Sequence, residues 1–147
     1  ASMCARGVHS CSEGYELAAA HGLMGEVTRN ATDFAAAAHI LGVYAAAYAN
    51  ATRGGREYPG TWDFFQCYPV VSAMRSVLWG SGEPGLLNQT TETTLRAAIA
   101  DVCQPQMVGV FNQALSRAAG TQLYLQLHPG PAQSLEQRYV DTVWRQW

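Results

Sequence analysis

Apolar residues recur along most of this chain at three- and four-residue steps, a pattern typical of amphipathic helices. In the first such stretch, Ser10 and Glu13 have the spacing of a capping box. They predict a helix from about Ser12 to Thr28. The stripe of this helix that we expect to be buried consists of Tyr15, Ala18, Ala19, Gly22 and Met24–Gly25.

A second helix is expected from Thr32 or Asp33 to about Ala51, and it is apolar nearly all round. Such a helix is expected at the centre of a fold rather than on its surface. Its residues include a seam at three- and four-residue steps: Phe34, Ala38, Leu41, Ala45 and Tyr48. The stretch is long enough to cross a membrane. However, alanine gains little on transfer into lipid and His39 interrupts the stretch, so we expect no membrane span.

Glycine and proline mark the remaining elements. Pro69 is expected in the first turn of a third helix that runs to Trp79. A fourth helix is expected from 91 to 102. A proline start and a glycine stop predict a fifth helix that begins at Pro105 and ends before Gly120.

The last part of the chain changes its period. Leucines at 123, 125 and 127 alternate with other residues, which predicts a short extended segment. Ser134 and Gln137 then form another capping box and open a final helix. Its apolar face consists of Leu135, Tyr139, Val140, Val143, Trp144 and Trp147.

These elements predict an all-α domain over residues 1–147, a bundle of five to six helices around the Ala-rich second helix. Because the chain stops at Trp147 inside a helical pattern, one interpretation is that the domain belongs to a longer extracellular or membrane-anchored protein. Hydrophobic residues make up 48% of the chain and charged residues 14%. The nine cationic residues are scattered arginines, so no basic cluster exists and nucleic acid is not an expected partner.

Three of the four asparagines begin an Asn-X-Thr triplet, the acceptor for N-linked sugars in secreted chains. They are Asn30, Asn50 and Asn88. Random placement of Ser and Thr would give roughly half a triplet for four asparagines. All three fall at expected helix boundaries, where a bulky sugar is accommodated at the surface. We therefore expect glycosylation at these positions and a secreted or extracellular location.

Four cysteines, an even number, support the same compartment: Cys4, Cys11, Cys67 and Cys103. In a secreted chain they predict two disulfides, and all three pairings remain open. The alternative is four buried thiols in a cytosolic protein. No cysteine and histidine spacing matches a zinc site, and we expect no metal.

The histidines are the first place to look for catalytic chemistry. His21 and His39 could meet across the first two helices, either as an acid–base pair or ligands, or as ordinary core histidines. The chain has no metalloprotease His-Glu-x-x-His, nucleophile elbow, P-loop or dinucleotide fingerprint. We expect no cofactor, and an enzyme is the less favoured class.

Two aromatic groups are candidate partner-binding surfaces: Tyr139, Trp144 and Trp147 on the last helix, and Tyr58 and Trp62 in a loop. The preferred hypothesis is a secreted or ectodomain glycoprotein that binds a protein without catalysis, as a receptor, viral-type surface or cytokine-like domain. The first alternative is a helical carrier of a small apolar ligand, which requires an internal void. The second is a small His-dependent enzyme, which requires His21 or His39 and a carboxylate in an open cleft.

Overall fold

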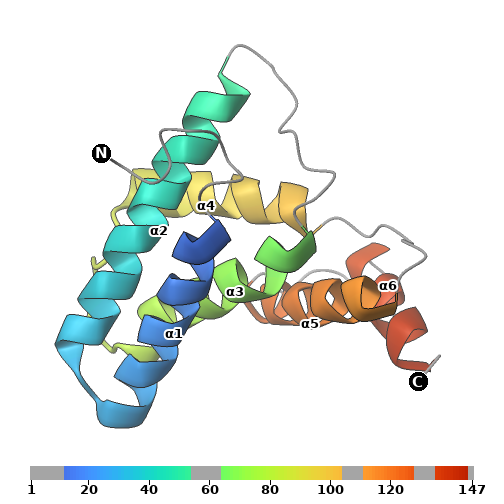
Figure 1. Ribbon diagram of the computed structural model, residues 1–147, viewed down its shortest axis with the longest axis horizontal. Helices are drawn as coiled ribbons and strands as arrows, with labels where there is room; N and C mark the ends of the chain where they lie inside the picture. Colours follow the sequence, from blue (N-terminus) through green and yellow to red (C-terminus); the bar gives the residue numbers. More distant parts are fainter. Residues whose placement is uncertain (1–11, 54–63, 104–110, 128–134, 146–147) are drawn as a thin grey trace.

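The computed structural model describes residues 12–53, 64–103, 111–127 and 135–145, and within them every regular element is helical (Figure 1). The predicted all-α class is therefore confirmed. The elements are α1 (Ser12–Thr28), α2 (Ala31–Thr52), α3 (Phe64–Arg75) with the π-helical turn η3 (Ser76–Gly80), α4 (Gln89–Val102), α5 (Phe111–Leu127) and α6 (Leu135–Arg145).

Helices α1, α2 and α4 begin and end within two residues of their predicted bounds. The predicted seam of α2 is buried along its whole length. In the stripe predicted for α1, Tyr15, Ala18, Gly22 and Gly25 are buried and Ala19 is half-buried. Met24 is the exception, because it lies on the exposed side of the helix. Ser10, the expected cap of α1, lies outside the described residues.

Two asparagines cap α2 and α4. The Asn30 side chain accepts a hydrogen bond from the backbone N–H of Thr32 at 3.0 Å. The Asn88 side chain accepts one from the backbone N–H of Thr91 at 2.8 Å. Each bond satisfies a donor that the first helical turn leaves unpaired, and an acidic residue in that turn complements the helix dipole. These caps explain why the two helices begin where they do.

A two-residue connection joins α1 to α2. Arg29 adopts a left-handed backbone conformation with φ of 55°, which is common immediately after a helix ends. Asn30 follows in an extended conformation and caps α2. This tight turn places α1 and α2 side by side, and the two helices contact each other.

The centre of the fold is α3 rather than the Ala-rich α2, so the prediction of a central α2 is wrong. Helix α3 contacts α1, α2, α4 and α5 (Figure 1). Alanine exposes little apolar surface, so α2 leaves part of its circumference in solvent at small cost, whereas the larger side chains of α3 need to be buried. In α3 the fully buried residues are Cys67, Val70, Val71, Ala73 and Met74.

The third helix also differs from its prediction. It begins at Phe64, so Pro69 lies inside the helix and not in its first turn. It continues into η3, where the N–H of Ser81 donates to the carbonyl of Ser76 at 3.0 Å. A Cβ on Gly22 of α1 would lie 2.9 Å from the Cβ of Ser76. These two small residues therefore allow α1 to lie directly against η3.

The prediction of a helix that ends before Gly120, followed by an extended segment over 123–127, is wrong. Helix α5 runs without interruption from Phe111 to Leu127. Gly120 is a packing residue: a Cβ there would lie 2.3 Å from the Cys67 Sγ and 2.7 Å from the backbone nitrogen of Tyr68. The glycine is present because α5 crosses α3 too closely for any side chain. The predicted start at Pro105 lies outside the described residues.

A disulfide joins Cys67 of α3 to Cys103, the C-terminal cap of α4, and both residues are buried. The hydroxyl of the buried Thr121 on α5 donates to the Cys103 carbonyl at 3.2 Å. One of the two predicted disulfides is thus present. Cys4 and Cys11 lie outside the described residues.

Helix α6 packs on α5 and buries Val140 and Val143, the latter against Ala118 and Leu115. These valines belong to the apolar face that the sequence predicts. Trp144 is on the exposed side of the helix instead, with 44% of its surface accessible.

The close crossing at Gly120 generates the first prediction. Replacing Gly120 with Ala should lower the free energy of unfolding by about 3 kcal/mol, because backbone atoms of α3 would have to move. The matched control is Gly42→Ala on α2, where the added Cβ meets no atom within 4 Å. That variant should be stabilised by about 0.5–1 kcal/mol through helix propensity. Urea unfolding measures both; equal effects would contradict the packing role of Gly120.

Candidate functional site

Within the described residues, a group of exposed apolar side chains lies on α1, opposite its buried side. Leu17, Leu23, Met24 and Val27 are between 48% and 72% exposed, and Ala20 is exposed among them. We call these five residues the outer face of α1. Soluble domains seldom leave several large apolar side chains together in solvent, and such patches mark interaction sites.

Helical spacing explains how one helix carries two apolar faces. The buried residues Tyr15, Ala18, Gly22 and Gly25 follow steps of three, four and three residues, and the exposed series that begins at Leu17 follows the same steps. The second series starts two residues later, which is about 200° around the helix. The first face packs against α2, α3 and η3, and the second points to solvent.

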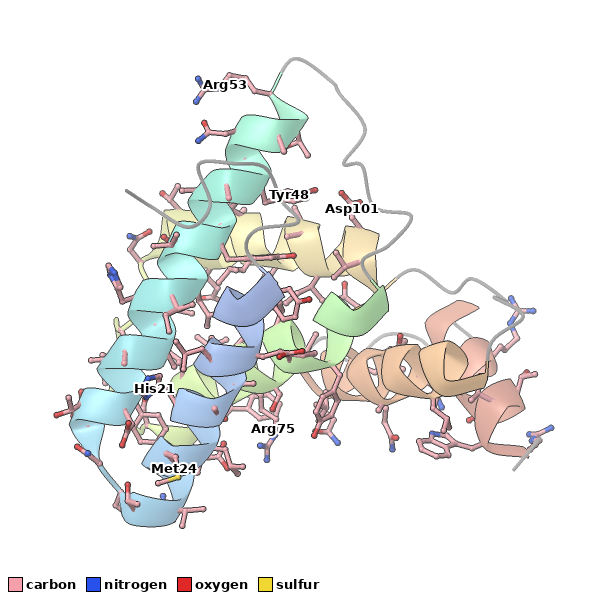
Figure 2. All side chains as sticks on the ribbon, in the orientation of Figure 1. His21, Met24, Tyr48, Arg53, Arg75 and Asp101 are labelled. Atoms are coloured by element: carbon pink, nitrogen blue, oxygen red, sulfur yellow. A yellow bond between two sulfur atoms is a disulfide. The ribbon has the colours of Figure 1, made fainter. Side chains whose placement is uncertain are left out.

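Sequence reasoning missed this surface. It assigned Met24 to the buried stripe, and it gave no role to Leu17, Leu23 or Val27. The signal was nevertheless present, because α1 has large apolar residues on sides that a single buried stripe does not use. Figure 2 shows Met24 on the C-terminal half of α1.

A groove runs along the exposed side of α2. Its volume is about 500 Å³, and it is open to solvent rather than enclosed. One wall is helix α2 and the other is the segment that leads into α4. The lining residues are Ala35, Ala38, His39, Gly42, Val43, Ala46, Leu86, Leu87, Asn88 and Thr91. Because the groove is open, it does not match the internal void that a carrier of an apolar ligand requires.

The three acceptor asparagines surround the exposed side of α2. Asn30 precedes the helix, Asn50 lies in its last turn, and Asn88 lines the groove. All three are exposed, as N-linked sugars require. Two of them also serve as helix caps, so Asn30 and Asn88 have a structural reason to be present besides glycosylation.

His21 is bound to the cap of α2. Its Nδ1 lies 2.9 Å from the Oδ1 of Asp33, and the Nδ2 of Asn30 donates to the Oδ2 of the same carboxylate at 3.1 Å. The carboxylate therefore joins α1 to the beginning of α2. Neither His21 nor Asp33 lines the groove.

His39 is exposed and lies in the groove, contrary to the expectation that it is a residue of a buried helix. It is six residues from Asp33 on α2, which is about 240° around the helix, so the two histidines lie on different sides of α2. Among the lining residues of the groove, His39 alone is ionisable. The structure thus pairs His21 with the Asp33 carboxylate outside the groove, whereas the lining of the groove around His39 contains no carboxylate.

A buried tyrosine joins α2 to α4. The hydroxyl of Tyr48 donates a hydrogen bond to the Oδ2 of Asp101 (Figure 2). Burial raises the pKa of Tyr48 to about 12, and the hydrogen bond to Asp101 and the negative charge of that carboxylate act in the same direction. The pair fixes the C-terminal half of α2 against α4.

Of the predicted aromatic contact residues, the structure places Trp144 on the exposed side of α6. Tyr58, Trp62, Trp147 and the side chain of Tyr139 lie outside the described part of the chain. Trp144 thus remains a candidate contact residue, and the outer face of α1 is a second candidate on a different helix.

Metal binding and membrane insertion are two further possibilities for the described residues. In that part of the chain, no group of three or more His, Cys, Asp or Glu side chains could hold a metal ion. By length and composition α2 could cross a membrane, and 39% of its most apolar window is buried inside the domain. Core helices of soluble proteins also meet this criterion.

Comparison of the chain with protein-family models, with curated proteins and with solved structures finds no match. Its function must therefore be inferred from its own residues.

The Tyr48–Asp101 pair generates a prediction about alkaline stability. The pKa of Tyr48 is about 12 in the folded state and about 10 in the unfolded state, so its stabilising contribution is complete below about pH 10. That contribution should be lost as the pH rises through about 12. The Tyr48→Phe variant should be less stable than the parent at neutral pH by about 1 kcal/mol, because it lacks the hydrogen bond.

Urea unfolding at several pH values checks this prediction. The difference in unfolding free energy between Tyr48→Phe and the parent should shrink between about pH 10 and 12. A difference that stays constant over this range would show that Tyr48 ionises equally in both states.

Proposed function

We propose that this domain is a secreted or ectodomain glycoprotein that binds a protein partner without catalysis, through the outer face of α1. The observation that carries the proposal is the position of that face, which is apolar, exposed and opposite the buried side of a helix supported by α2, α3 and η3. A rigid helix that presents side chains at three- and four-residue steps is a recurrent way to bind a groove or another helix.

The distribution of acceptor asparagines supports the choice of face. Asn50 and Asn88 belong to the α2 and α4 side of the domain, and Asn30 lies beyond the end of α1. Sugars at these positions would cover the exposed side of α2. They would leave most of the outer face of α1 open, from Leu17 to Met24.

The buried Cys67–Cys103 disulfide supports an extracellular location, because such bonds persist in oxidising compartments. With these two cysteines paired, Cys4 and Cys11 have only each other as a partner within the chain. We therefore propose a second disulfide between Cys4 and Cys11.

The acceptor asparagines at the two ends of α2 also indicate whether that helix could cross a membrane. Asn30 and Asn50 lie at opposite ends of α2. If α2 crossed a membrane, these residues would face opposite compartments, and only one could receive a sugar. Sugars on both would require α2 to lie wholly on the extracellular side, which is the arrangement we propose.

The test of the binding face is Met24→Glu, which places a charge in the middle of the outer face of α1. The matched control is Val43→Glu, which places the same charge at an exposed apolar position on α2. The secreted domain and both variants are tetramerised and tested against an array of individually displayed extracellular proteins. Thermal unfolding verifies that each variant is folded.

We expect saturable binding that Met24→Glu weakens by about 30-fold or more, the effect of changing a central contact residue by 2 kcal/mol. Val43→Glu should bind as the parent does. Equal binding by the parent and Met24→Glu would show that the outer face of α1 is not the contact surface. Loss of binding in Val43→Glu alone would assign contact to the α2 side.

A further inference from the structure

The groove on α2 exists because its walls carry few large side chains. Four of its ten lining residues are alanine or glycine, and a Cβ added to Gly42 would meet no atom within 4 Å. Val43 is 38% exposed along it, and Leu86 on the opposite wall is only half-buried. The surface is therefore an unfilled depression with apolar patches and a few polar groups. Its volume of about 500 Å³ is in the range of small-ligand sites.

One wall of this groove carries a potential attachment point for a sugar. Asn88 lines the groove and begins the triplet Asn-Gln-Thr. Its Oδ1 accepts the capping hydrogen bond from the backbone N–H of Thr91, and this cap does not use the Nδ2. The Nδ2 of Asn30, by contrast, already donates to Asp33. A sugar on Asn88 would therefore leave the cap of α4 intact.

We propose that the groove on α2 holds the first sugar of an N-linked glycan on Asn88. This inference rests on the proposed secretory route. In the attachment step, the Nδ2 of Asn88 forms a bond to C1 of the first N-acetylglucosamine of a lipid-diphosphate-linked oligosaccharide. The lipid diphosphate leaves from that carbon with its electron pair, and the nitrogen loses one of its two protons.

The lining suits an N-acetylated sugar. Val43 and Leu86 offer apolar surface to the sugar ring and to the acetyl methyl group. His39 and Thr91 offer polar groups to the hydroxyls and to the acetamide. The occupant covers an apolar depression that would otherwise remain in contact with water. It also closes the exposed side of α2 to proteins, which leaves the outer face of α1 as the contact surface.

The experiment measures how well His39 is protected from a reagent. The domain is secreted from eukaryotic cells as the parent, as Thr90→Ala, which removes the acceptor but keeps Asn88 as a cap, and as Thr90→Ser, which keeps the acceptor. Each is treated with diethyl pyrocarbonate, and carbethoxylation of His39 is measured by peptide mass spectrometry. His21, which lies outside the groove, serves as the internal reference.

We expect His39 to react several-fold more slowly, relative to His21, in the parent and in Thr90→Ser than in Thr90→Ala. Trimming the glycan enzymatically to its first sugar should preserve this protection, because that sugar is the one proposed to lie in the groove. Equal reactivity in all three proteins, with Asn88 glycosylated in the parent, would overturn the inference. Protection that disappears on trimming would overturn it too, because it would come from the outer branches.

Mass spectrometry that shows which of the three asparagines carry a sugar distinguishes failure of this inference from failure of the proposed function. A sugar on Asn30 or Asn50 with none on Asn88 would overturn the proposed sugar site in the groove. It would still agree with the proposed secretory route. No sugar at any of the three asparagines would overturn both.

Discussion

The crossing of three helices at the Cys67–Cys103 disulfide is the constraint on which the rest of the structure depends. The bond joins the buried helix α3 to the end of α4, and α5 passes so closely that Gly120 has no room for a side chain. The hydroxyl of Thr121 then binds the Cys103 carbonyl. Because α3 is held from these sides, it forms a fixed support against which α1 packs, and α6 is attached through α5.

The proposed functional surfaces follow from that support. Helix α1 buries its glycine-containing stripe against α2, α3 and η3, so its second apolar face has no remaining neighbour within the described domain and points to solvent. Helix α2 is exposed along one side, where its small residues leave a groove next to Asn88. One side is thus suited to a protein and the other to a sugar, and the two proposals depend on the same packing.

The sequence predicted those parts of the fold that local chemistry determines. It predicted the bounds of α2 and α4 to within two residues and the seam of α2 from helical periodicity, but it did not identify the asparagine caps that set the starts of both helices. It could not predict the role of Gly120, because a glycine that ends a helix and one that allows a close crossing look alike until the neighbouring helix is placed. The central position of α3 and the outer face of α1 were missed for a related reason. Apolar residues on several sides of a helix do not reveal which side the fold will cover.

The proposed extracellular location, with N-linked sugars and two disulfides, is tested most directly by the intact mass of secreted material. We predict a loss of mass on enzymatic removal of N-linked sugars, with conversion of Asn30, Asn50 and Asn88 to aspartate. Reduction should then add two hydrogens for each of two disulfides, Cys67–Cys103 and Cys4–Cys11. A mass that changes under neither treatment would contradict the extracellular assignment.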